Sequence, residues 1–338
     1  MLTSELDYEL PEALIAQKPA EPRDSSRLMV VDVGEGTISH HIFADLPRFL
    51  RPADALVLNE TKVLPARIVA HKPSGGEVEL LFLRDLGGPW EVLARPSKRL
   101  GPGLVLSAGG EQLGVVKGLG GGHWIVKGRD VRGMLQRSGR MPLPPYIEPS
   151  AEAERAYQTV YARNPGSAAA PTAGFHFTRR VLAEAEGAGA EIVRVTLHVG
   201  AGTFAPIRAR SLEEHWMHAE YYSVPDHAVR TVQKARSVLA AGTTVARTLE
   251  TWAASGEREG ESRLFIYPGY EWLAVDALLT NFHLPRSTLL AMVMSFGGKG
   301  LVREAYRVAI EERYRFYSFG DAMLLIGGGR NLWIPRSP

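Results

Sequence analysis

The stretch from Arg67 to Val131 consists of short apolar runs that glycines interrupt at regular intervals, such as RIVAH, GGEVELLFLR, GPWEVLARP and GPGLVLSAGG. Runs of about 4 to 8 residues with turn residues between them are typical of small antiparallel barrels or sandwiches. The proline cluster PLPP at 142–145 follows, and its fixed φ angles and missing donors fit neither a helix interior nor a central strand. We therefore expect a compact β domain that ends at this cluster.

Both flanks of this stretch have a different pattern, in which strand-like and helix-like runs alternate. Strands are expected at Leu28–Val33, Ala55–Leu58, Glu191–Val199 and Arg263–Tyr267, and helices at Thr178–Glu186, His227–Arg236, Val245–Ala253 and Leu301–Tyr314, with Thr178 and Thr244 as N-caps. Helices between apolar strands predict an α/β layer. The expected fold class is α/β: a mixed α/β main domain formed by residues 1–65 and 148–338, with a small antiparallel β-barrel domain inserted over residues 66–147.

The sequence contains no cysteine, which excludes thiolate nucleophiles, Cys-ligated iron–sulfur clusters and disulfides. Chemistry must therefore use histidines, carboxylates, hydroxyls, amines or backbone groups. A chain without disulfides is expected in a reducing cytoplasm. The longest apolar run, Leu289–Met294, is far shorter than the ~20 residues that span a bilayer, so no membrane contact is expected.

Charge is distributed unevenly along the chain. Residues 66–147 contain twelve basic and six acidic side chains, whereas the remainder contains 27 basic and 31 acidic ones. A basic module beside a mildly acidic one indicates a polyanionic partner for the first. The alternative is a solvated basic face that binds nothing.

Three histidines lie between apolar residues and next to loops with Gly or Pro: His176 in FHF, His198 in LHV and His283 in FHLP. Imidazole titrates near neutral pH, and α/β proteins place ligands on loops of this kind. These histidines are therefore candidates for proton transfer. The alternative is that each is a hydrogen-bonded residue of the core.

Two further patterns are weaker. The string GAGTFA at 200–205 matches G-x-G-x-x-[GA], but Pro206 follows where a dinucleotide-binding helix should begin, so we expect no Rossmann site. His215 and His218 have helical spacing and lie near Glu220, yet no compact set of the H-E-x-x-H kind accompanies them. We expect no metal, although a metal-dependent hydrolase that uses these two histidines remains an alternative.

Longer strings resemble a known family along nearly the whole chain. They include LVLNETKVLPARI, AAPTAGFHFT, TLHVGAGTFAPIR, DALLTNFHLPRSTLLAMV and YRFYSFGDAMLLI, in this order. In these strings the chain resembles the S-adenosylmethionine:tRNA ribosyltransferase-isomerase (QueA) family of queuosine biosynthesis. The resemblance extends from about Tyr8 to Ile326 and leaves the tail at 327–338 uncovered.

The resemblance implies both a fold and a reaction. The fold is an α/β domain that carries an inserted β-barrel. The reaction transfers and isomerises the ribosyl moiety of S-adenosylmethionine onto 7-aminomethyl-7-deazaguanine at the tRNA wobble position, which gives epoxyqueuosine-tRNA, adenine and methionine. It implies no metal and no cofactor, because S-adenosylmethionine is consumed as a substrate, and we expect a monomer. The alternative from another class is a non-catalytic RNA-binding protein.

This chemistry selects residues by type. The carbon beside the sulfonium must lose a proton, adenine must be helped to leave, and the RNA amine must be neutral to attack. The catalytic candidates are His176, His198 and His283, with Glu220 and Asp321 as carboxylate alternatives. The substrate-binding candidates are Thr172, Gly174, Phe175, Gly200, Gly202, Thr203, Phe204, Thr243, Thr244, Arg247 and Glu250. The tRNA-binding candidates are Lys62, Arg67, Lys98, Arg99, Tyr314, Arg315, Phe316 and Tyr317, the last four of which could instead be a helix end packed on the core.

Overall fold

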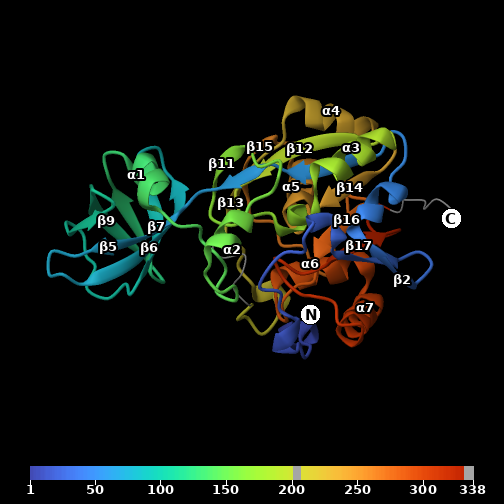
Figure 1. The fold of residues 1–338 in the computed structure, drawn as a ribbon, viewed down its shortest axis with the longest axis horizontal. Helices are drawn as coiled ribbons and strands as arrows, with labels where there is room; N and C mark the ends of the chain where they lie inside the picture. Colours follow the sequence, from blue (N-terminus) through green and yellow to red (C-terminus); the bar gives the residue numbers. More distant parts are fainter. Residues whose placement is uncertain (201–206, 331–338) are drawn as a thin grey trace.

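The computed structural model describes residues 1–200 and 207–330 and has two parts, a large α/β body and a smaller β-barrel beside it (Figure 1). The body is built on a nine-stranded mixed sheet. Its order is β15 (Glu259–Ser262), β13 (Glu220–Ser223), β12 (Glu191–Leu197), β3 (Ala55–Asn59), β14 (Val238–Ala241), β16 (Ala277–Asn281), β17 (Ala322–Ile326), β1 (Arg27–Asp32) and β2 (Thr37–Ile42). The predicted fold class, a mixed α/β domain with an inserted barrel, is confirmed.

Strand direction decides which residues meet at each edge of this sheet. β12, β3, β14 and β16 run parallel to one another, whereas β17 and β1 run the opposite way. β13 is antiparallel to β12, and β15 is antiparallel to β13. One edge therefore collects the carboxyl ends of β12, β3, β14, β16 and β15 together with the amino ends of β13, β17 and β1.

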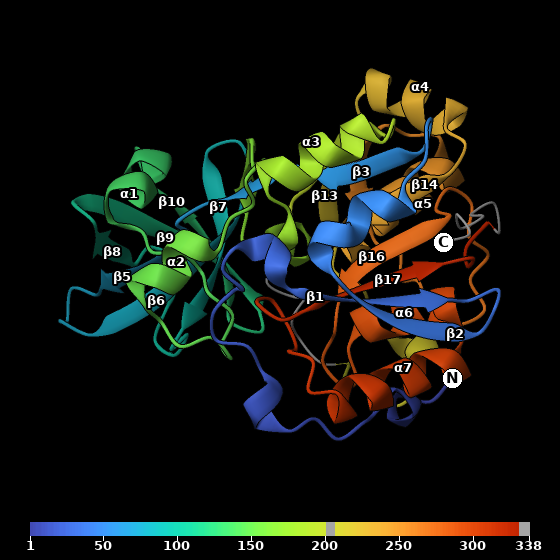
Figure 2. The same ribbon diagram turned by 45° about the vertical axis from the view of Figure 1, so that its right-hand side comes forward.

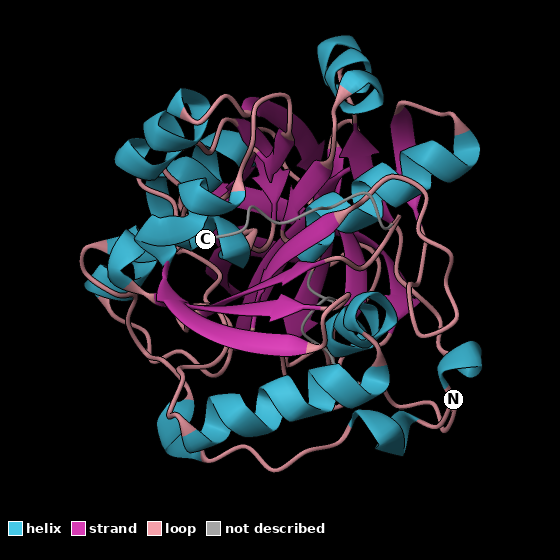
Figure 3. Cartoon of the chain, turned by 90° about the vertical axis from the view of Figure 1, so that its right-hand side faces the viewer, coloured by secondary structure: helices cyan, strands magenta, loops and turns pink. Residues whose placement is uncertain are grey.

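The sheet is buried on both faces, which explains why its central strands appear in the sequence as continuous apolar runs. Successive residues of β3 alternate between two cores: Val57 belongs to one and Leu56 and Leu58 to the other. The first core is covered by α4 (Asp226–Lys234), α5 (Thr243–Ser255), α6 (Thr288–Gly297) and α7 (Lys299–Glu311). The second is covered by α3 (Arg179–Gly187) and the 3₁₀ helix η4 (Phe43–Phe49). Figures 2 and 3 show helices on both sides of the twisted strands.

The inserted part is a closed antiparallel barrel with its own core. Its strands are, in order around the barrel, β10 (His123–Lys127), β7 (Pro89–Arg95), β6 (Glu77–Asp85), β5 (Arg67–His71), β8 (Val105–Ala108) and β9 (Glu111–Gly120). The helix α1 (Val131–Ser138) begins at the N-cap Asp130, whose carboxylate accepts the Gly133 N–H, and adds Met134 and Leu135 to the barrel core. That residues 66–147 form an independent domain stays a prediction.

Short elements complete the described chain. A parallel pair of β4 (Thr61–Val63) and β11 (Asn164–Ser167) lies near the link to the barrel, and α2 is Ala151–Ala156. The remaining 3₁₀ helices are η1 (Thr3–Leu6), η2 (Glu12–Leu14), η3 (Arg23–Ser25), η5 (Thr172–His176) and η7 (Leu212–Glu214). Among the described residues, no helix is long and apolar enough to cross a membrane.

The element predictions are confirmed for the strands at 28–33, 55–58 and 191–199 and for the four helices, with shifts of up to three residues at their ends. Thr178 caps α3 as expected, since its hydroxyl accepts the Val181 N–H. Two predictions are wrong. Arg263–Tyr267 is not a strand, because β15 ends at Ser262, and Thr244 is not an N-cap, because α5 begins one residue earlier and its N-cap is Gly242.

Candidate active site

The candidate site lies at the edge where the parallel strands end, because that edge collects polar side chains from segments far apart in the sequence. His198 follows β12, Thr243 and Thr244 follow β14, Asn281 ends β16, and Glu220 begins β13. The chain also enters the barrel from this edge, because β4 and then β5 of the barrel directly follow β3 in the chain. The site and the barrel therefore share one side of the body.

A groove runs along this edge in three adjoining hollows. The first two share Thr172, Asn281, His283 and Leu289, and the second and third share Thr243, Thr244 and Leu289. Tyr146 and Tyr317 line one end, and Glu220 and Arg247 line the other. The groove thus joins the ends of β14 and β16 to the start of β13.

Of the three candidate histidines, only His283 lines this groove. Its Nε2 lies 2.6 Å from Thr280 Oγ1, and its backbone N–H donates to the Tyr306 hydroxyl at 2.9 Å. Burial lowers the pKa of His283 from 6.5 to about 3, so the ring is neutral at physiological pH. No residue in the described part of the chain hydrogen-bonds its Nδ1, which leaves that nitrogen able to exchange a proton.

His176 lies behind the groove and is held on both ring nitrogens. The Asn281 amide donates to Nε2 at 3.0 Å, so Nδ1 carries the proton and donates to Ser26 Oγ at 2.7 Å. Its ring stacks on Phe43, and burial together with the charges of Arg315 and Arg23 lowers its pKa to about 3. Asn281 in turn accepts a hydrogen bond from Thr172 Oγ1 at 3.0 Å. This geometry suits the positioning of Asn281 and Thr172 better than proton transfer.

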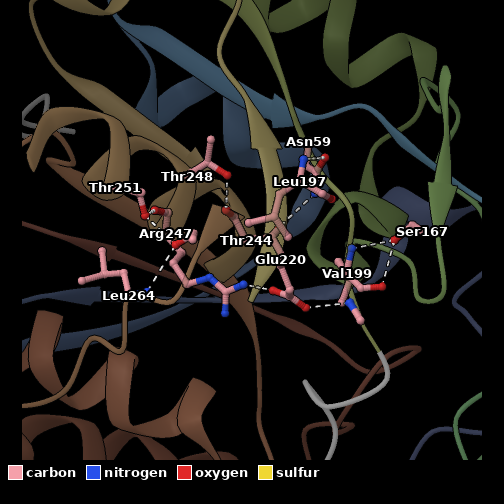
Figure 4. Close-up of polar contacts among 12 residues, drawn as sticks. Asn59, Ser167, Leu197, Val199, Glu220, Thr244, Arg247, Thr248, Thr251 and Leu264 are labelled. Atoms are coloured by element: carbon pink, nitrogen blue, oxygen red, sulfur yellow. Dashed lines mark hydrogen bonds and ion pairs between the residues drawn. The ribbon is translucent and has the colours of Figure 1, made fainter. Parts of the chain in front are cut away.

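Glu220 and Arg247 form a buried ion pair at the other end of the groove (Figure 4). Glu220 also accepts the Gly200 N–H at 2.6 Å, which ties β13 to the loop after β12. Burial lowers the pKa of Arg247 to about 10, so it still carries its charge at neutral pH. A fixed cation and a fixed anion lie side by side here, as the zwitterionic end of an amino acid requires.

His198 faces a second hollow, a cleft of about 860 Å³ between the body and the barrel. Its Nδ1 lies 2.8 Å from Thr61 Oγ1, and its ring stacks on Tyr221 at 5.6 Å. Burial, and secondarily the charge of Arg132, lowers its pKa, which favours the neutral ring. Glu220 lines both this cleft and the groove, so the two hollows meet at that carboxylate.

Several other candidates lie away from the groove. Glu250 is buried and accepts hydrogen bonds from Tyr270 Oη and from the N–H groups of Leu273, Ala274 and Val275, at 2.8 to 3.0 Å, so its carboxylate holds the 270–275 segment in place. The Asp321 carboxylate likewise accepts hydrogen bonds from the backbone N–H groups of Arg27 and Arg315.

Phe175 and Gly174 serve packing as well. Phe175 packs between Tyr157 and Phe319 and has no open face for adenine. A Cβ at Gly174 would lie 2.2 Å from the Tyr161 hydroxyl, so glycine is required there for close packing. Neither residue is therefore placed to make the ligand contact predicted for it.

Most of the string at 314–317 packs on the core, which is the alternative expected for it from the sequence. Tyr314 and Phe316 are fully buried against Phe282, so their predicted stacking on RNA does not fit the structure. Arg315 pairs with Asp321 at 3.3 Å. Tyr317 alone of the four lines the groove.

The predicted phosphate contacts are scattered. Lys62 is exposed in β4, Lys98 and Arg99 are exposed between β7 and β8, and Arg67 is half-buried and donates to the Leu143 carbonyl. None of the four lines the interdomain cleft.

Gly202, Thr203 and Phe204 lie outside the described residues. Within the described ranges, no group of three or more His, Asp or Glu side chains is arranged to hold a metal ion.

The sequence reasoning missed Asn281, Thr280, Tyr146 and the exposed Trp216. Asn281 and Thr280 are part of the same TNFHLP string that contains His283, so the signal was present beside a residue that was chosen. Trp216 lies between His215 and His218, which the sequence pattern offered only as possible metal ligands.

A groove at the carboxyl ends of parallel strands is where α/β proteins bind ligands, and here it joins a cleft against a barrel that is rich in basic residues. Residues 3–325 match the family model described as queuosine biosynthesis protein. The chain is 72% identical over 333 residues to the S-adenosylmethionine:tRNA ribosyltransferase-isomerase of Rubrobacter xylanophilus (98% of this chain, 100% of the relative), and 50% identical over 342 residues to that of Moorella thermoacetica (96% and 100%). The crystal structure of S-adenosylmethionine tRNA ribosyltransferase from Thermotoga maritima is similar, with 38% identity, a TM-score of 0.57 and coverage of 96% and 100%. The chain belongs to the S-adenosylmethionine:tRNA ribosyltransferase-isomerase family of queuosine biosynthesis.

Proposed function

We propose that this chain carries out the family's reaction where the groove meets the interdomain cleft. The ribosyl moiety of S-adenosylmethionine is transferred and isomerised onto 7-aminomethyl-7-deazaguanine at the tRNA wobble position, with release of adenine and methionine. The single observation that supports this location is that Glu220 lines both hollows. S-adenosylmethionine in the groove and an RNA base in the cleft would meet there.

The groove offers contacts for each part of S-adenosylmethionine. Arg247 would bind the carboxylate of the methionine end and Glu220 its ammonium and the nearby sulfonium. Thr172, Thr243, Thr244 and Asn281 offer hydroxyl and amide groups to the nucleoside. His283 lines the groove beside these groups, and its Nδ1 has no hydrogen-bond partner among the described residues, so this nitrogen would transfer a proton to or from the bound nucleoside.

On the cleft side, His198 would accept a proton from the aminomethyl group of the RNA base. Its lowered pKa keeps the imidazole in the form that can do so, and the amine must be neutral before it can attack carbon. His176 would keep Asn281 and Thr172 in position. No cofactor beyond the consumed S-adenosylmethionine is proposed, and the chain is proposed to act as a cytoplasmic monomer.

The test combines the protein, S-adenosylmethionine and a tRNA that carries the deazaguanine base, and follows adenine and methionine by chromatography. We expect both products, with or without a chelator. If neither product forms even with added metal, the proposal fails. If a chelator stops the release of both products, the expectation that the reaction needs no metal is wrong. His283→Ala is expected to lower kcat by about 10²- to 10⁴-fold. The exposed His227→Ala on α4 is the matched control and should keep the wild-type rate.

A further inference from the structure

The interdomain cleft is lined by both parts of the molecule. The barrel contributes Trp90 of β7, His123 of β10, Arg132 of α1 and the end of β6, and the body contributes residues 216 and 218–221 together with Arg263. Its volume of about 860 Å³ lies near the upper end of the range of about 300–1,000 Å³ for small-molecule sites. The cleft therefore has room for more than the one aminomethyl group that the reaction consumes.

Trp216 is an unusual residue to find in the lining of this cleft. Its relative exposure is 70%, the highest among the exposed large apolar residues of the described chain. Indole rings are normally well buried. The guanidinium of Arg263 lies over the ring, 5.1 Å from its centroid. One face of the indole is thus covered by a cation, and the exposure of the side chain leaves the other face open to a ligand.

The charges of the lining favour an anion. Each of its acidic side chains already has a basic partner: Asp85 with Arg132, Glu261 with Arg84, Glu91 with His123 and Glu220 with Arg247. Arg95, Arg208 and Arg263 also line the cleft, and none of them has an acidic partner among residues 1–200 and 207–330. Three guanidinium groups thus remain for phosphates.

We infer that Trp216, backed by Arg263, is the platform on which an unpaired base of the tRNA anticodon loop stacks, with the neighbouring phosphates held by the cleft arginines. Unpaired bases are bound in this way, on aromatic rings and guanidinium planes. Trp216 and Glu220, at which the cleft meets the groove, line the same cleft, so a base held on the indole lies in the hollow that leads to the proposed reaction site. This inference rests on the proposed function and adds a binding residue that no sequence pattern indicated.

The test measures binding of an anticodon stem-loop RNA that carries 7-aminomethyl-7-deazaguanine, by fluorescence anisotropy, to the intact protein. Trp216→Ala is expected to raise Kd about 5- to 150-fold, the usual effect of removing one stacking partner, while Trp216→Phe stays within a few-fold of wild type. Leu273→Ala, which removes another exposed apolar side chain outside the cleft, is the control and should bind as wild type does. An unchanged Kd for Trp216→Ala would overturn the inference.

Two further measurements separate stacking from misfolding and from a purely ionic contact. The slope of log Kd against log salt should be the same for Trp216→Ala as for wild type, and about one unit shallower for Arg263→Ala, because only the second variant removes a cation. RNA should quench tryptophan emission in the wild type, and this quenching should be lost in Trp216→Phe although the variant still binds. Quenching that persists in Trp216→Phe would place the stacked base elsewhere.

Failure of the inference differs from failure of the proposed function. If wild-type protein releases adenine with the modified tRNA but Trp216→Ala has an unchanged KM for RNA, only the stacking role is lost. If the wild type releases no adenine, the proposed function itself is wrong. KM for S-adenosylmethionine should be unaffected by Trp216→Ala, because the indole lies outside the groove residues.

Discussion

The buried histidines His176 and His283 couple the stability of the protein to pH. Burial lowers the pKa of both from 6.5 to about 3. Between these values the unfolded chain binds more protons than the folded one, so stability rises with pH. The contribution of each neutral ring is complete above pH 6.5 and is lost as the pH falls toward 3.

From this we predict that His176→Asn flattens the acid side of the stability curve. Removing one such group should reduce the slope of the unfolding free energy against pH by up to about 1.4 kcal/mol per unit between pH 6 and 4. Urea denaturation at a series of pH values measures this slope. His227→Asn, at an exposed position on α4, should leave it unchanged. A wild-type slope in His176→Asn would mean that His176 titrates normally in the folded protein.

The element that shapes the middle of the groove is the turn from β14 into α5. Gly242 has a φ of 108°, a conformation that L-residues rarely adopt, and a Cβ added there would contact the side chain of Ala173. We predict that Gly242→Ala destabilises the protein by about 1–3 kcal/mol and raises KM for S-adenosylmethionine, because alanine would strain the backbone of the turn that carries Thr243 and Thr244. Thermal unfolding and initial rates measure the two effects.

The opposite end of the same helix provides the control. Gly256 also has a positive φ, 75°, but a Cβ there would meet open space far from the groove residues. Asn tolerates this left-handed conformation, so Gly256→Asn should cost little stability and leave KM unchanged. Equal effects of the two substitutions on KM would remove the turn from the binding site.

At the element scale, much of the fold was predictable because both faces of the sheet are buried, which gives continuous apolar runs such as Ala55–Leu58. The run at Arg263–Tyr267 is also mostly apolar but packs on the core as a loop, since Ile266 is buried and its neighbours lie against the same cluster. In the sequence, a short apolar segment that forms a strand cannot be told from one that packs on the core as a loop. Only its pairing with a neighbouring strand distinguishes them.

The candidate site was predictable by residue type and not by role. Glu220 in β13 and Glu250 in α5 are both buried glutamates of the body, but the first lines the groove and the second accepts hydrogen bonds from three backbone N–H groups. Likewise, the three histidines have similar neighbours in sequence, and only the end of β16 brings His283 to the groove. Roles depend on which strand ends meet at one edge, and this is a property of topology.

For the whole molecule, the position of the barrel determines how the cleft opens. Among the ion pairs of the described residues, Arg84–Glu261 is the one that joins the barrel to the body, and both side chains are about half exposed. An exposed pair contributes roughly 0–1 kcal/mol and weakens with salt. It can therefore bias the angle between the two parts without adding much to the stability of either.

We predict that Arg84→Ala loosens the barrel in the RNA-free protein. Small-angle X-ray scattering should show a larger radius of gyration than that of wild type, with the thermal midpoint nearly unchanged, and high salt should shift the wild type in the same direction because it screens the pair. Arg258→Ala removes another exposed ion pair, with Asp226, that lies wholly within the body, so it should leave the scattering curve as it is. If Arg84→Ala and Arg258→Ala scatter identically, the angle of the barrel is set by the chain connections near β4 and β11, and the ion pair across the cleft has no part in it.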